Sequence, residues 1–389
     1  GCSSNAARIC ELYLADDRAF KRDFKTVGTS LPDTFSFIVS RTGRDAGWRA
    51  RVAAITNIVR NGDAIAQELI ATRCDRGAQI VRRLRFPESV AQGIRALDEH
   101  FDGEGRPDRL AGDDIPVASR IALLAQVVDV FHSAHGIEAA VAEVRRRRGT
   151  WLDPQVVDAF TQARQAPAFW ATLAGASLSS EVRALEPARH AIEVDEDYLD
   201  DIAEAFGAVV DTKSSYTAGH SLRVAEITSA LAHAIGMPPE RGRWLRRGAL
   251  LHDVGKLGVS NTILDKPGRL DADEWIAVRK HAAYTGEILG RLPAFAELAR
   301  VASAHHEKLD GTGYPLGLGA ADIPLETRII TTADIYDAIS APRPYHAARD
   351  PDTTLGIMQG HVGTAIDPLC FEALRTVVAG WPAASAMPA

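Results

Sequence analysis

The sequence predicts an all-α fold, and three observations lead to this prediction. Apolar residues recur at three- and four-residue spacing, for example at Ala66, Leu69 and Ile70, which is the period of a helix with one buried face. Segments rich in Val, Ile and Thr, which are typical of strands, are short and few. The chain has 389 residues, of which 46% are hydrophobic and 24% charged. This length and composition suit a globular chain with two helical domains.

The pattern of the first half recurs in the second half. The segment Asp102-Gly-Glu-Gly-Arg-Pro107 matches Asp310-Gly-Thr-Gly-Tyr-Pro315, and the register continues without a gap to Asp129 and Asp337. Such internal similarity indicates two copies of one fold. Four polar residues of the second copy are replaced in the first, where the matching residues are Arg73, Leu97, Asp98 and Gln126. We therefore expect the first copy to fold without binding metal.

Three helices are predicted at the start of the second copy. Acidic residues precede an apolar stripe at 199–210, which predicts a helix with a charged first turn and one buried face. The next helix should begin at His220 and end at Gly236, which is a suitable residue for the position after a helix. A third apolar helix should end where His252 and Asp253 emerge.

Net charge and cysteine spacing restrict the partners. The formal net charge is −7 and the pI is about 6.0, so we expect no nucleic acid polymer and no membrane as partner. The four cysteines lack a CxxC pair, which favours a reducing compartment over a disulfide framework or a zinc ribbon. We expect a cytoplasmic protein, since the sequence shows neither a signal peptide nor a long apolar run. The chain begins with Gly1, so we also expect an additional domain outside it.

Histidines and carboxylates gather in the second copy. His305 and His306 precede a turn rich in glycine, whose irregular backbone lets both imidazoles point into one site. Two adjacent histidines with no other candidate ligands are more often one buried histidine beside an exposed one. Here, however, five segments contribute seven metal-ligand candidates, namely His220, His252, Asp253, His281, His305, His306 and Asp334. Seven ligands exceed one tetrahedral ion and suit two divalent metal ions that share a carboxylate.

This ordered set resembles the HD-GYP family, a subset of the HD phosphohydrolases, from about Asp195 to Phe371. The resemblance implies bacterial signal transduction and a metal-dependent phosphodiesterase that hydrolyses cyclic di-GMP to linear pGpG, GMP or both. It implies two divalent metal ions bridged by Asp253. Iron or manganese is expected in preference to zinc, cobalt or nickel. Two domains are expected. Residues 1–187 form a degenerate copy without metal ligands, for which truncation at the start is an alternative, and residues 188–389 form the catalytic domain. A homodimer is also expected.

The resemblance further implies the residues that act on the substrate. Asp253 and Lys256 are the expected catalytic residues, because Lys256 could stabilise developing negative charge. The expected substrate contacts are Lys256, Asp310, Gly311, Tyr314, Arg343 and His346. Some family members bind a third metal through a glutamate where this chain has Tyr216, so two metals are expected here. His346 stands where many relatives have Lys or Arg. Another cyclic dinucleotide or nucleotide as substrate, or a nucleotide-binding sensor with little turnover, therefore remains an alternative.

Overall fold

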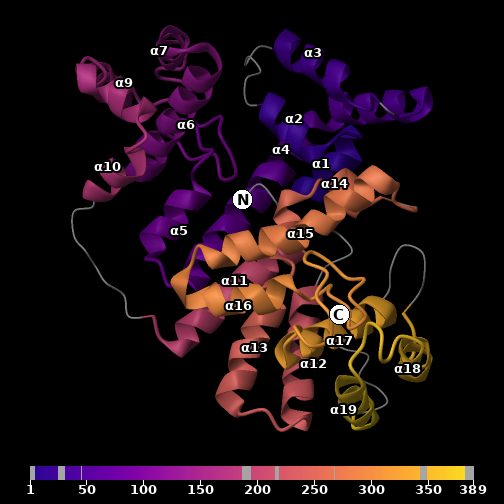
Figure 1. Ribbon diagram of the computed structural model, residues 1–389. Helices are drawn as coiled ribbons and strands as arrows, with labels where there is room; N and C mark the ends of the chain where they lie inside the picture. Colours follow the sequence, from indigo (N-terminus) through magenta and orange to yellow (C-terminus); the bar gives the residue numbers. More distant parts are fainter. Residues whose placement is uncertain are drawn as a thin grey trace. The chain divides into compact units, whose positions relative to one another are not determined.

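The computed structural model is helical, and no strand occurs in the part of the chain that it describes (Figure 1). The all-α prediction is thereby confirmed. The described residues are 5–24, 31–44, 46–185, 194–214, 219–266, 268–341 and 348–381. The predicted boundary at residue 187 lies outside them, and the two predicted domains stay a prediction.

The chain forms two compact units. The first comprises Lys21–Thr42 and Trp48–Glu196, and the second comprises Asp197–Ala389 together with Cys2–Phe20 and Gly43–Gly47. The N-terminal segment therefore packs with the second unit, although it is far from that unit in sequence.

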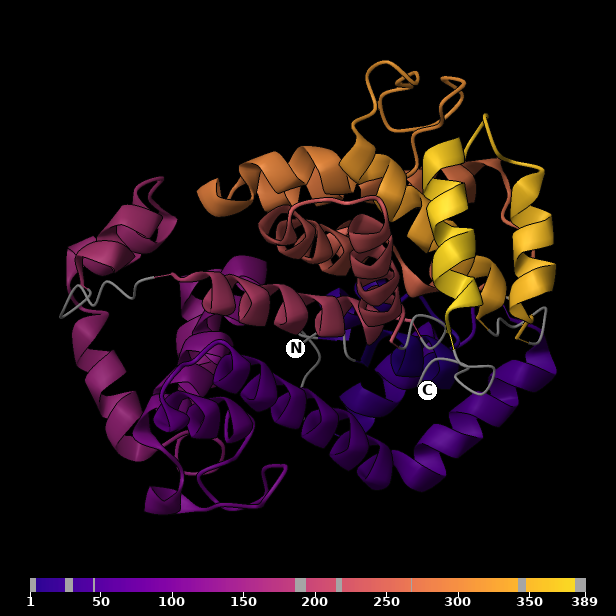
Figure 2. The same ribbon diagram turned by 90° about the horizontal axis from the view of Figure 1, so that it is seen from below.

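The first unit is built on one long helix. Its helices are α3 (Leu31–Arg41), α4 (Trp48–Arg83), α5 (Glu88–Arg95), α6 (Val117–His135), α7 (Ile137–Arg146), α8 (Pro154–Ala163), α9 (Pro167–Ala174) and α10 (Leu178–Ala184). Helix α4 bends at Asn61, where φ is −116° and ψ is 15°, and Figure 2 shows the bend. The core lies between α6, α7 and α8, where Val128, Val144 and Phe160 are buried.

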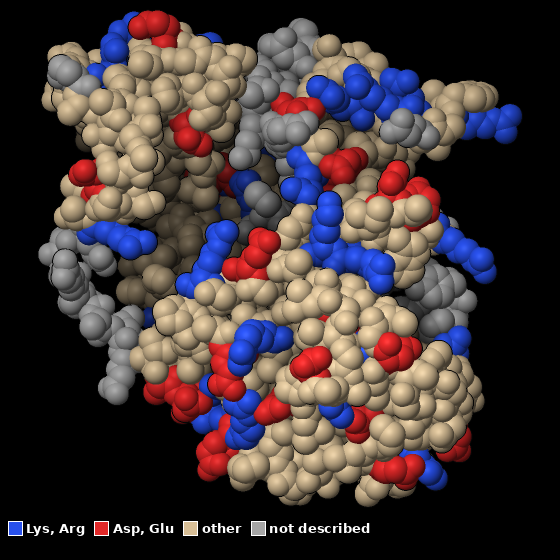
Figure 3. All heavy atoms as spheres, viewed as in Figure 1, with Lys and Arg blue, Asp and Glu red and all other residues tan. Residues whose placement is uncertain are grey.

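Helix α6 is also the one described helix that is long and apolar enough to cross a membrane by length and composition alone. A core helix passes the same test, so this finding leaves the cytoplasmic location a prediction. On the face drawn in Figure 3, acidic and basic side chains are interspersed.

The second unit surrounds one apolar core. Its helices are α1 (Ala6–Tyr13), the start of α2 (Asp17–Phe24), α11 (Glu196–Asp211), α12 (His220–Ala234), α13 (Pro239–Leu251), α14 (Asn261–Leu264), α15 (Ala272–Gly290), α16 (Ala296–Ser303), α17 (Leu325–Ser340), α18 (Pro351–Gln359) and α19 (Pro368–Ala379). The predicted helix start at His220 is confirmed, and Gly236 follows the end of α12 with φ +82°. Helix α13 ends one residue before His252, as predicted. Buried Leu231, Leu251 and Ile330 belong to the core that holds these helices together.

The N-terminal segment is tied to the second unit by buried polar contacts. The Asp17 carboxylate accepts a hydrogen bond from the Asn261 backbone N–H at 3.1 Å and lies 3.4 Å from Lys213 Nζ. Both side chains of the ion pair are at most 4% exposed. A pair of charges this deeply buried is stable only while both partners are present. The N-terminal segment is therefore part of the second unit's interior.

Candidate metal centre

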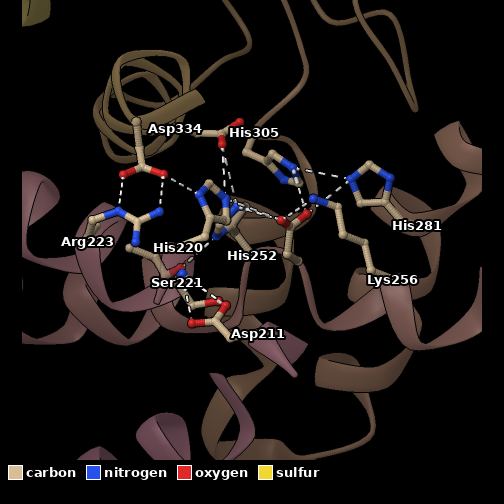
Figure 4. Close-up of polar contacts among 12 residues, drawn as sticks. Asp211, His220, Ser221, Arg223, His252, Lys256, His281, His305 and Asp334 are labelled. Carbon is tan, nitrogen blue, oxygen red and sulfur yellow. Dashed lines mark hydrogen bonds and ion pairs between the residues drawn. The ribbon is translucent and has the colours of Figure 1, made fainter. Parts of the chain in front are cut away.

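Helix ends deliver most of the predicted ligands to one point in the second unit. His220 is the first residue of α12, and His252 and Asp253 follow the last residue of α13. His305 and His306 come just after α16. His281 and Asp334 extend from α15 and α17. In Figure 4 the labelled histidines and Asp334 point toward one another.

The ligand atoms separate into two sets around one carboxylate. His220, His252 and Asp334 form the two-histidine group, and His281, His305 and His306 form the three-histidine group; within each group the ligand atoms lie within 4.8 Å of one another.

The two oxygens of Asp253 face different groups. Oδ2 lies 3.5 Å from His220 Nε2 and 3.2 Å from His252 Nε2. Oδ1 lies 3.4 Å from His281 Nε2 and 3.8 Å from His305 Nε2. Because each oxygen serves one group, Asp253 has the geometry of a bridging ligand.

Backbone carbonyls fix the orientation of three histidines. Nδ1–H of His252 donates to Ala249 O at 2.7 Å, and the same atom of His281 donates to Val278 O at 2.6 Å. His305 makes the corresponding bond to the carbonyl of residue 302 at 2.7 Å. In each ring Nε2 then carries the lone pair that a metal needs.

Burial keeps histidines of the three-histidine group neutral, as metal binding requires. Burial holds the pKa of His305 well below its ordinary value and lowers the pKa of His306 to about 3, so both rings are neutral. Burial alone would raise the pKa of Asp253, but His252 and Lys256 hold it well below the ordinary range. Among the described residues, His252 Nε2 and Asp253 Oδ1 are buried without a hydrogen-bond partner. Buried polar atoms are rarely left unpaired, and a pair of metal ions would satisfy both.

A second carboxylate, that of Asp337, contacts the Nδ1 side of the His220 ring. His220 Nδ1–H donates to Asp337 Oδ2 at 2.7 Å, and Arg223 Nε donates to Asp337 Oδ1 at 2.6 Å. A carboxylate in this place fixes the ring orientation of a metal-ligating histidine. Sequence reasoning missed both supporting roles. The available signal was that Asp337 follows Asp334 by three residues, which places both on one face of a helix.

The remaining predicted site residues lie around this centre. Lys256 Nζ lies 2.5 Å from Asp253 Oδ2. The ring of Tyr314 lies beside that of His306, with centroids 4.7 Å apart. Asp310 accepts hydrogen bonds from the N–H and O–H of Thr312 at 2.9 and 2.7 Å, which shapes its own turn.

Some substrate predictions stay open after this placement. Gly311, in the same turn as Asp310, has φ +76°. The contacts of Asp310 and Gly311 with substrate stay predictions. Arg343, His346 and Tyr216 lie outside the described residues.

A glycine lets the helices around the centre approach each other. A Cβ on Gly255 would lie 1.9 Å from His281 O and 2.7 Å from Thr285 N. The Thr285 side chain accepts a hydrogen bond from Gly255 N–H at 3.0 Å and donates one to His252 O at 2.9 Å. Glycine two residues after Asp253 is therefore required for the segment that follows α13 to pack against α15.

Comparison with known proteins places these observations in context. The HD domain family matches residues 54–156 and 204–369. The chain is 56% identical to 3'3'-cGAMP-specific phosphodiesterase 3 of Vibrio cholerae serotype O1 over 375 residues, which are 96% of this chain and 82% of that protein. It is 34% identical over 200 residues to a cyclic di-GMP phosphodiesterase response regulator of Xanthomonas campestris pv. campestris, covering 51% of this chain and 52% of that protein. The crystal structure of a cyclic GMP-AMP specific phosphodiesterase of V. cholerae superposes with a TM-score of 0.59 at 46% identity and covers 98% of this chain and 92% of that one.

Proposed function

This chain belongs to the HD domain family and to its HD-GYP phosphodiesterases, and from that premise we propose that it hydrolyses 3'3'-cyclic GMP-AMP in preference to cyclic di-GMP. The observation that supports this choice of substrate is the share of the chain that each relative matches. The similarity to the V. cholerae 3'3'-cGAMP-specific enzyme 3 runs through 96% of the chain, whereas similarity to the Xanthomonas cyclic di-GMP enzyme covers 51%.

Matches over less than half of the chain do not separate the two substrates. Two further V. cholerae 3'3'-cGAMP-specific enzymes are 36% and 39% identical to this chain over 44% and 42% of its length. A Pseudomonas aeruginosa cyclic di-GMP phosphodiesterase is 35% identical over 44% of it. The preference for 3'3'-cyclic GMP-AMP therefore rests on the resemblance of the whole chain.

The geometry of the centre supports hydrolysis of a phosphodiester. The two-histidine group would hold one divalent ion, the three-histidine group would hold the other, and Asp253 would lie between them. Bound there, two such ions would supply an activated water and polarise the phosphoryl oxygens. Lys256, beside Asp253, offers a positive charge where negative charge develops on the phosphate. Cleavage of one phosphodiester opens the cyclic substrate to a linear dinucleotide.

A substrate panel tests this proposal. Purified protein, reconstituted with Mn²⁺ or Fe²⁺, is incubated with 3'3'-cyclic GMP-AMP, cyclic di-GMP and cyclic di-AMP, and products are separated by chromatography. We expect the highest kcat/KM for 3'3'-cyclic GMP-AMP, loss of turnover with EDTA, and recovery on adding metal back. His252→Ala and Asp253→Asn serve as inactive controls. Equal or higher kcat/KM for cyclic di-GMP would overturn the substrate, and nucleotide binding without turnover would favour the sensor alternative.

A further inference from the structure

Cations near the metal centre differ in whether a carboxylate neutralises them. Lys256 pairs with Asp253 at 2.5 Å, and Arg223 pairs with Asp337 at 2.6 Å. Arg279 lies on α15, two residues before the ligand candidate His281. Within the described part of the chain, it makes no ion pair with a carboxylate. Its charge is therefore available to an anionic ligand.

Arg279 is held at the rim of the centre by an aromatic ring. Its guanidinium carbon lies 4.5 Å from the centroid of the Tyr314 ring. The Tyr314 ring is in turn 4.7 Å from His306 and 6.3 Å from His281, measured between centroids. Tyr314 thus contacts both the exposed guanidinium and the three-histidine group. A cation over an aromatic face is stabilised there, and this contact restricts the positions that the arginine explores.

The proposed substrate needs such a cation. A cyclic dinucleotide carries two phosphodiester charges, and the metal pair accounts for the one that is cleaved. The second charge needs a cation outside the ligand set, because Lys256 and Arg223 are already paired with Asp253 and Asp337. A guanidinium fork binds phosphate oxygens through two parallel hydrogen bonds. A guanidinium beside the centre that is not paired with a carboxylate can bind this second phosphate.

We propose that Arg279, held on Tyr314, binds the phosphate of the cyclic dinucleotide that is not being cleaved. This inference rests on the proposed function and identifies a substrate-binding residue for it. Arg279 then contributes to affinity for two-phosphate substrates and not to the hydrolysis step itself. The kcat/KM for a substrate with a single phosphodiester should not depend on Arg279.

Two substrates and two neighbouring variants test the inference. Arg279→Gln is compared with Lys280→Gln, which removes the same charge from the next, exposed position of α15. The substrates are 3'3'-cyclic GMP-AMP and bis(p-nitrophenyl) phosphate, which has one phosphodiester. We expect Arg279→Gln to raise KM for the cyclic dinucleotide by about ten- to a hundredfold, the loss typical of a charged hydrogen bond. It should leave kcat/KM for bis(p-nitrophenyl) phosphate within about twofold of wild type, since that substrate lacks the second phosphate.

Further readouts separate binding from structure. Arg279→Lys keeps the charge and should recover part of the affinity, while metal content and Tm of all variants should match the wild type. An unchanged KM in Arg279→Gln, an equal loss on both substrates, or the same KM increase in Lys280→Gln would overturn the assignment of Arg279. If the wild type cleaves bis(p-nitrophenyl) phosphate but no cyclic dinucleotide, the proposed function falls, and the role of Arg279 falls with it.

Discussion

The variant Asp337→Asn should weaken one metal site and spare the other. The native Asp337 carboxylate accepts a hydrogen bond from His220 Nδ1–H at 2.7 Å. An amide keeps the shape of the side chain but removes the charge and can turn an N–H toward the ring. Loss of such a partner lowers metal affinity by about ten- to a hundredfold, or ~1.4–2.8 kcal/mol. We expect the larger loss, because the change also weakens the ion pair in which Arg223 donates to Asp337 at 2.6 Å.

Titration of metal-free protein with Mn²⁺, followed by the electron paramagnetic resonance signal of the free ion, resolves the two sites. The wild type should bind two ions. In Asp337→Asn the three-histidine group should keep its affinity, while the two-histidine group should bind about a hundredfold more weakly. Asp352→Asn is the matched control, since that exposed carboxylate lies in the first turn of α18. Equal weakening at both sites, or wild-type binding at both, would refute the role of Asp337 in orienting His220.

Three other perturbations probe the framework of the two units. Asp17→Ala leaves the buried Lys213 ammonium unpaired, so chemical denaturation should show that the free energy of unfolding falls by about 3–5 kcal/mol. The double variant Asp17→Leu/Lys213→Met should recover most of this stability. A single variant as stable as wild type would contradict the buried pair. Gly255→Ala places a Cβ 1.9 Å from His281 O, so circular dichroism and the hydrolysis assay should show misfolding or inactivity, and a folded, fully active variant would disprove the close approach. Burial lowers the pKa of His100 to about 4; the unfolded chain therefore binds more protons between about pH 4 and 6.5, and stability falls as pH drops through that window. Urea unfolding at pH 5 and 7.5 should show this loss in the wild type and a smaller one in His100→Phe, and equal pH dependence in both would argue against it.

The candidate ligands could be selected from the sequence because each lies in a short segment with its own signature, and the structure brings them together. His220 starts a helix, and His305 and His306 precede a turn rich in glycine. The supporting residues could not be predicted in the same way. The spacing of Asp334 and Asp337 places Asp337 on the same helix face, but its contact with His220 spans 117 residues, and only the packed helices show that pairing. Metal ligands impose residue types on a sequence, whereas the carboxylate behind a ligand is recognised only once the helices are packed.

The N-terminal segment shows a second limit of sequence patterns. Asp17 and Lys213 are 196 residues apart and form a buried pair in the second unit. Periodicity identifies the buried face of a helix, but it does not identify the partner that covers that face. The structure adds this information for α1 and the start of α2.

The two units contain the same turn, held in the same way. In the first, the Glu99 carboxylate accepts a hydrogen bond from the Asp108 backbone N–H at 2.6 Å. In the second, Glu307 accepts one from the Leu316 N–H, also at 2.6 Å. Glycine is required next to each glutamate, because a Cβ at residue 105 or 313 would lie within 2.5 Å of the backbone of that turn. These matched contacts support the proposal that the two units are copies of one fold.

The copies differ where a metal would bind. Arg73 and Asp98 form an ion pair in the first unit, at the positions that match His281 and His306 in the second. Two neutral imidazoles each present a lone pair that needs a hydrogen-bond donor or a metal ion. An arginine and a carboxylate satisfy each other. Exchanging the two histidines for this pair therefore removes the need for an ion while the glutamate-held turn keeps its shape. This contrast supports the proposal that the first copy retains the scaffold of a metal site and has replaced the metal by an internal charge pair.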